Sequence, residues 1–188
     1  MSFSRRSLLA LPLALAACAS DAPLRTSFPP LTYDYLLKLR LNVADVELSP
    51  PPPPGPLDEL DPVPPAQALL QMGRDRLVAG GSLGRAVFVI DQAQILRIPN
   101  GFDGTLSVHL DVQTSEGTRA GFAEARVSRR LVGIGDDLRG GLYDITQQMM
   151  QDMNVEFEYQ VRRTLRDWLQ EASTAPAPAA VERQPLSP

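Results

Sequence analysis

Two of the residue types that most often do chemistry occur once each in this chain of 188 residues: one histidine, His109, and one cysteine, Cys18. A zinc site usually needs three or four ligands, so this pair is poor material for a metal centre. His109 lies where apolar and polar residues alternate, which places it on the polar face of a strand. We therefore interpret His109 as structural or solvent-exposed, and we expect neither a metal nor another cofactor.

Gly80, Ser82 and Gly84 match the letters Gly-x-Ser-x-Gly of the nucleophile elbow of α/β-hydrolases. That motif must leave a strand and open a helix, whereas here the glycines follow an expected helix and precede an expected strand. Ser82 and His109 are the best candidates for a catalytic pair. His109 follows Ser82 too closely, however, to leave room for the acidic residue that lies between serine and histidine in the chain order of these hydrolases. The sequence therefore predicts a turn rather than an enzyme, with a small periplasmic hydrolase of unrecognised site as the alternative.

The stretch 118–132 contains several arginines, and its apolar and polar residues alternate as they do in a strand. Arg119, Arg126 and Arg130 could contact a partner or a lipid headgroup, or they could protect a solvated sheet edge with charge. The formal net charge of the whole chain is −4. An acidic protein is a poor candidate for binding nucleic acid.

The N-terminus carries a basic head, Arg5-Arg6, then an apolar run, then Leu15-Ala16-Ala17-Cys18. This order is that of a secretory signal, and its end resembles the lipobox of bacterial lipoproteins. The resemblance implies cleavage before Cys18, a diacylglyceryl thioether on Cys18 and acylation of the new amine. Several acyl chains would anchor the protein durably to a membrane. With Cys18 as the only cysteine, no internal disulfide can form.

Two further signals concern export and sorting. Ser4 to Leu9 resembles a twin-arginine motif, which would deliver a folded domain, but a general signal with two arginines explains it equally well. Ala19 follows the cysteine, where aspartate would retain an enteric lipoprotein in the inner membrane. The resemblance thus implies an envelope protein facing the periplasm, on the inner leaflet of the outer membrane.

Composition divides the chain into four parts. Residues 1–17 are the expected signal peptide, and residues 18–30, which are small, polar and proline-bearing, an expected tether. Residues 31–171 form one expected α/β domain, interrupted by a proline-rich loop at 49–65. Residues 172–188, rich in alanine and proline, are expected to be disordered.

Periodicity predicts an α+β fold. We expect strands at 31–48, 86–98, 106–113 and 118–132, and helices at 64–79 and from 138 to about 168. The expected architecture is a two-layer sandwich: a four-stranded, mainly antiparallel sheet with both helices on one face, in the order strand-helix-strand-strand-strand-helix. Eight residues should meet in its core: Leu106, Val108, Leu110, Val112, Leu142, Ile145, Met149 and Phe157.

This order, with residues 39–43, 74–81 and 88–91, resembles the auxiliary lipoproteins of ABC-type transport systems of the Gram-negative envelope. Lipoproteins that assemble lipopolysaccharide or activate peptidoglycan synthases share much of the order. The resemblance implies a non-catalytic partner of a transport or outer-membrane maintenance system, with transporter subunits as its protein partners. Fold alone does not fix function.

Overall fold

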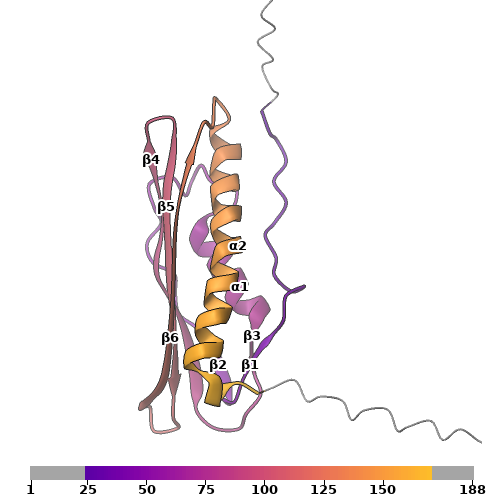
Figure 1. Cartoon of the computed structure of the whole chain (residues 1–188), viewed down its shortest axis with the longest axis vertical. Coiled ribbons are helices and arrows are strands. Elements are labelled where there is room, and N and C mark those ends of the chain that lie inside the picture. The colour runs from indigo at the N-terminus through magenta and orange to yellow at the C-terminus, as the bar shows by residue number, and fades with distance from the viewer. Residues whose placement is uncertain (1–23, 171–188) are drawn as a thin grey trace, which may run out of the picture.

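The computed structural model describes residues 24–170, which are elongated along one axis (Figure 1). The class is α+β, as predicted. In chain order the elements are β1 (Leu39–Leu41), β2 (Asp45–Leu48), α1 (Pro65–Arg76), β3 (Leu77–Ala79), β4 (Arg85–Ile98), β5 (Gly101–Gln113), β6 (Arg119–Val132), α2 (Leu138–Thr164) and the 3-10 turn η1 (Arg166–Trp168).

Four strands form the main sheet in the order β2-β4-β5-β6. Strands β4, β5 and β6 make the antiparallel meander that the alternating stretches predict. β2 instead pairs in parallel with β4, with Asp45 opposite Arg85. The sheet is therefore mixed, and the prediction of a mainly antiparallel sheet is wrong. The cause is α1, because a helical crossover returns the chain to its sheet in the same direction.

The N-terminal half also differs from the predicted order of elements. The stretch 31–48 forms only β1 and β2, separated by a bend at residues 42–44, and residues 31–38 join no strand. The helix expected at 64–79 ends at Arg76, because residues 77–79 form β3, which pairs in parallel with β1. Two short strands, β1 and β2, thus replace one long strand. In addition, β1 and β3 form a small second sheet, which the helical periodicity of the sequence does not predict.

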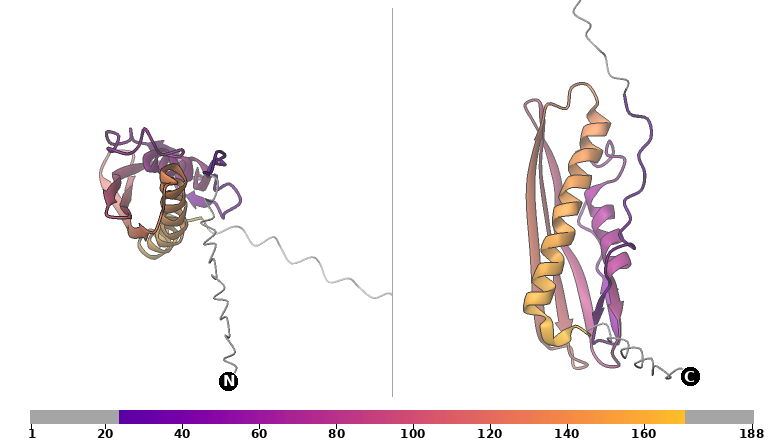
Figure 2. Two further views of the ribbon diagram at one scale, coloured as in Figure 1. Left: turned by 90° about the horizontal axis from the view of Figure 1, so that it is seen from above. Right: turned by 45° about the vertical axis from the view of Figure 1, so that its right-hand side comes forward.

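Both helices pack on one face of the main sheet, as predicted (Figure 2). Phe88 of β4 contacts both: its ring centroid lies 5.6 Å from that of Phe157 in α2, and a Cβ added to Gly73 of α1 would lie 3.2 Å from it. All eight predicted core residues are fully buried. Burying each such side chain contributes about 1.5 to 3 kcal/mol.

Helix α2 begins where its sequence predicts. The Asp137 side chain accepts a hydrogen bond from the Gly140 backbone N–H at 2.9 Å, which caps the helix. From there α2 runs the length of the molecule beside β6 and β5 (Figure 1).

Residues 24–38, here called the N-terminal arm, lie along the outside of the domain (Figure 2). Arg25 forms an ion pair of 2.6 Å with Asp144, and the Tyr143 hydroxyl donates to the Pro29 carbonyl at 3.0 Å. The Phe28 and Tyr143 rings are in contact. The chain therefore enters the domain beside the first turns of α2 and reaches β1 at the opposite end.

Candidate functional site

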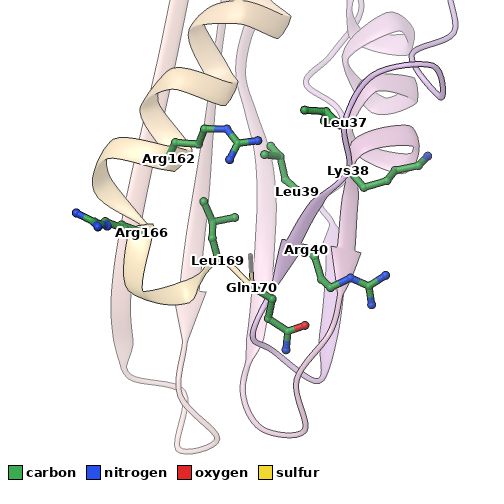
Figure 3. A pocket seen from close by; sticks show the side chains of 8 residues that line it. All are labelled: Leu37, Lys38, Leu39, Arg40, Arg162, Arg166, Leu169 and Gln170. Carbon is green, nitrogen blue, oxygen red and sulfur yellow. The ribbon is translucent and has the colours of Figure 1, made fainter. Parts of the chain in front are cut away.

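A groove of about 390 Å³ lies where the end of α2 faces β1, and we call it the β1 groove (Figure 3). Its lining combines exposed and buried leucines with four cations. The lining residues are Leu37, Lys38, Leu39, Arg40, Arg162, Arg166, Leu169 and Gln170. Leu39 is buried, whereas Leu37 is 70% exposed. The groove thus joins an apolar surface to a concentration of positive charge in an acidic protein.

The C-terminal segment builds one end of the groove by pairing with β1. Leu41 and Leu169 form an antiparallel bridge. The Asn42 N–H donates to the Trp168 carbonyl at 2.7 Å, and the Gln170 N–H donates to the Arg40 carbonyl at 2.9 Å. Within residues 24–170, no backbone hydrogen bond continues this pairing past Gln170. The described end of the chain, residues 168–170, therefore lies along the edge of β1 that faces the groove.

The four cations flank the groove from two sides. Arg162 points across it toward Leu39, whereas Arg166 points away from the groove and Lys38 and Arg40 project to the far side of β1 (Figure 3). Arg162 bonds Glu158 at 2.8 Å, and the Lys38 ammonium donates to the Asp75 carbonyl. Among the described residues, the guanidinium groups of Arg40 and Arg166 have no hydrogen bond or ion pair.

Behind the groove, Arg76 fixes the backbone of the segment that leads into β1. Its guanidinium is buried and donates to the Leu37 carbonyl at 3.3 and 3.2 Å, to Asn154 and, at 2.5 Å, to Glu158. Burial acts to raise the pKa of Glu158, but the hydrogen bonds from Arg162 and Arg76 outweigh it and lower that pKa. Glu158 therefore stays ionised and ties both arginines to α2.

The structure places the arginines singled out by sequence on the outer face of the sheet, and Arg126, near the edge of β6, also lines a shallow hollow with Glu156 and Gln160 of α2. Each has its own polar neighbour: Arg119 pairs with Asp111 at 2.9 Å and Arg130 with Asp103 at 2.6 Å. Arg126 donates to Gln92 at 3.4 Å. They follow one another along β6 and do not converge on a common point. Their role as a contact surface stays a prediction.

His109 lies on the same outer face of β5. A bulge between Ile90 and Gln92 leaves Asp91 as an extra residue in β4. An Asp91 carboxylate oxygen lies 2.8 Å from His109 Nδ1. No group of three or more histidine, cysteine or acidic side chains within residues 24–170 is placed to hold a metal ion.

Ser82 lies at the end of the molecule, where it lines a separate hollow with Thr114 and Trp168. Thr114 is five strand positions from His109, which corresponds to about 17 Å. The structure therefore does not bring Ser82 to His109, and the hydrogen-bonded partner of the histidine is Asp91.

Cys18 lies outside the described residues, as do the signal peptide, the first part of the tether and residues 172–188. The described part of the tether, residues 24–30, contains no helix or strand and contacts α2 through Arg25 and Phe28. No helix among the described residues is both long and apolar enough to cross a membrane.

Sequence reasoning missed the β1 groove. The alternation of Leu37 to Leu41 was visible and was interpreted as part of a strand, and Arg162 and Arg166 are spaced for one helix face. Nothing local reveals that residues 168–170 return to pair with β1. That contact between distant parts of the chain is what places the end of the chain beside β1 and forms the groove.

Comparisons with known proteins place few limits on function. No protein-family model matches the chain, and no curated protein matches it. Among solved structures, a minor lipoprotein from Acinetobacter baumannii is 12% identical with a TM-score of 0.24, over 64% of this chain and 95% of the other. A likeness this weak carries no argument about the function of this chain.

Proposed function

We propose that this protein is a lipid-anchored, non-catalytic partner protein of the bacterial cell envelope. It would serve a transport system or the maintenance of the outer membrane, from the inner leaflet of that membrane. The observation that carries the proposal is the placement of two features: the chain that follows the lipobox enters at one end of the elongated domain, and the β1 groove lies at the other (Figure 1).

The spacing between anchor and domain supports this arrangement. Five residues lie between Cys18 and Leu24, and even fully extended the six steps from one to the other span only about 20 Å. Arg25 is tied to Asp137 and Asp144 at the start of α2. With 27 residues, α2 extends about 40 Å away from that point. An anchored domain would therefore present the β1 groove away from its own membrane.

The proposed anchor is tested by metabolic labelling with a radioactive fatty acid. We expect the wild-type protein to incorporate label and to fractionate with membranes, whereas the Cys18→Ala variant should do neither. Equal labelling of the two proteins would overturn the lipoprotein assignment and leave an ordinary signal peptide.

The partner role is tested by cross-linking in membranes and purification, in parallel with complementation by a His109→Ala variant. Recovery of transporter subunits, with complementation intact, would support a non-catalytic partner. The alternative is a small hydrolase using His109, for which the Asp91–His109 contact is the one favourable observation. Loss of complementation by a folded His109→Ala protein, with no partner recovered, would favour that enzyme.

A further inference from the structure

We propose that the end of the domain where the chain enters rests in the lipid interface of the anchoring membrane, through an apolar surface that we call the loop tip. The loop tip consists of Leu96 and Ile98 at the end of β4 and Val132 at the end of β6. The inference specifies a lipid contact for the anchored protein proposed above, and so rests on its anchor. Three features carry it: adjacent exposed apolar side chains, loops that hold them in place, and a short tether.

The side chains of the loop tip are neighbours on the outer face of the main sheet. Ile98 pairs with Gly101 of β5, and Gly101 pairs in turn with Val132 of β6. Leu96 lies two positions before Ile98, on the same face. Val132 is 62% exposed and Leu96 is 45% exposed. Because Gly101 has no side chain to separate its neighbours, the three residues form one apolar surface, of the kind that marks a contact site.

The next positions along the outer face of β5 and β6 are polar. Asp103 and Arg130 are opposite each other and form an ion pair of 2.6 Å. Beyond them, the outer face of β5 continues with Thr105, Ser107, His109 and Asp111. The change from polar to apolar side chains therefore occurs at the end of the domain where the chain enters.

The loops beside this surface are held in place. The Gly133 N–H donates to the Asn100 carbonyl at 2.8 Å, which joins the β6–α2 loop to the β4–β5 turn. Gly133 and Gly135 have φ values of 79° and 57°, which glycine adopts readily. Between them lies Ile134, and a Cβ added to Gly141 of α2 would be 2.9 Å from its side chain. A surface formed in advance loses little conformational entropy when it binds.

The tether identifies a lipid surface as the occupant. The arm begins at the same end of the molecule as the β4–β5 turn and the β6–α2 loop (Figure 1). Arg25 of the arm lines one small hollow together with Val132. The six steps from Cys18 to Leu24 span at most about 20 Å. With the arm docked, an acylated Cys18 would thus keep the membrane within reach of the loop tip.

Charge adds little to this contact. Arg97 is exposed beside the loop tip and suits lipid phosphates, but Asp136, exposed in the β6–α2 loop, opposes it. The apolar surface must therefore supply the attraction. We expect the same contact with vesicles of phosphatidylcholine and with vesicles that also contain phosphatidylglycerol.

The test uses the lipidated full-length protein in both kinds of vesicle, with an environment-sensitive fluorophore on Pro99→Cys in the exposed β4–β5 turn. Lipids brominated on the acyl carbons near the headgroup quench a fluorophore that touches them. An apolar surface sinks about 5 to 10 Å into the interface. Ser128, exposed on the same face, lies about 13 Å behind Val132 along β6. The label on Pro99→Cys should therefore be quenched about threefold more strongly, or better, than one on Ser128→Cys.

Variants test the apolar side chains themselves. Leu96→Asp combined with Val132→Asp should reduce quenching of the Pro99→Cys label about threefold or more, because charged side chains are repelled from hydrocarbon. The protein should still float with the vesicles, since its acyl chains remain. Leu83→Asp is the matched control, because Leu83 is 70% exposed in a loop at the other end of the domain. That control should leave the quenching unchanged.

Equal quenching at positions 99 and 128 in protein that floats with vesicles would overturn the inference and leave the anchor intact. Apolar surroundings at position 99 without quenching by brominated lipid would mean that protein, such as a second copy, covers the loop tip. Unchanged quenching in the Leu96 and Val132 double variant would mean that the tether alone holds this end at the membrane. Protein that carries no lipid and does not float would contradict both this inference and the envelope assignment.

Discussion

Arg76 joins three parts of the molecule through one buried guanidinium. It is 1% exposed, and its donors reach the arm at Leu37 and α2 at Asn154 and Glu158. A buried cation is costly unless it is paired and its hydrogen bonds are made, and here both conditions hold. The contribution of Arg76 to stability is therefore best measured by removing it, which leaves the Leu37 carbonyl and Glu158 without this partner.

Replacing Arg76 by alanine should lower the free energy of unfolding by about 3 to 5 kcal/mol, because Glu158 and the Leu37 carbonyl lose their partner. Arg76→Lys should be intermediate, since one ammonium cannot reproduce the fork of the guanidinium. Urea denaturation gives the measurement. Arg74→Ala, an exposed change on the same helix, is the control and should stay within about 0.5 kcal/mol of wild type. A loss below 1 kcal/mol for Arg76→Ala would contradict this account.

Asp61 is a buried carboxyl in the loop before α1, 6% exposed, where it accepts hydrogen bonds from Val63 N–H and the Thr146 hydroxyl. Burial raises its pKa to about 6, and the two hydrogen bonds oppose that rise only in part. Because the pKa is higher in the folded protein, protonated Asp61 favours folding. That contribution is present below about pH 4 and is lost as pH rises toward 6.

The Asp61→Asn variant should therefore gain stability relative to wild type as pH rises from 4 to 7. The pKa difference corresponds to roughly 3 kcal/mol. Urea midpoints of both proteins at the two pH values provide the comparison, with exposed Glu59→Gln as the matched change. If wild type and Asp61→Asn keep a constant difference in stability between pH 4 and 7, Asp61 does not titrate in this range.

At the scale of elements, sequence periodicity predicts those helices and strands that depend on local sequence alone. The alternation in 106–113 predicts the buried face of β5, and the apolar spacing from residue 138 predicts α2. The three-to-four spacing of Leu69, Met72, Leu77 and Ala79 predicts a helix through residue 79. Only the parallel pairing with β1, a contact between distant segments, makes residues 77–79 a strand.

One pair of substitutions tests which face of the main sheet is buried. Val108→Asp places a charge on the fully buried face beneath the helices, and we expect that protein not to fold. Ser128→Asp, on the exposed face of β6, should melt within a few degrees of wild type. Circular dichroism melting curves distinguish the two. Similar melting temperatures would mean that the assigned faces are reversed.

At the scale of the whole molecule, the domain has two different ends. One end carries the entry of the chain and the start of α2, and the other carries β1, η1 and the β1 groove (Figure 2). The arm connects the ends along the outside, held at its start by Arg25. If Cys18 bears lipid, this attachment determines which end faces the membrane.

That orientation can be measured because Cys18, once acylated, has no free thiol, so an added cysteine is the only one that reacts. Arg97→Cys lies at the entry end of β4, and Glu116→Cys lies in the turn at the groove end. The two sites are separated by about 37 Å along β5. With a donor fluorophore on each and acceptor lipids in vesicles, energy transfer should be stronger from position 97. An unlipidated Cys18→Ser background should abolish transfer from both. Stronger transfer from position 116 would mean that the groove end faces the membrane, and equal transfer would mean that the arm leaves the domain when the protein is anchored.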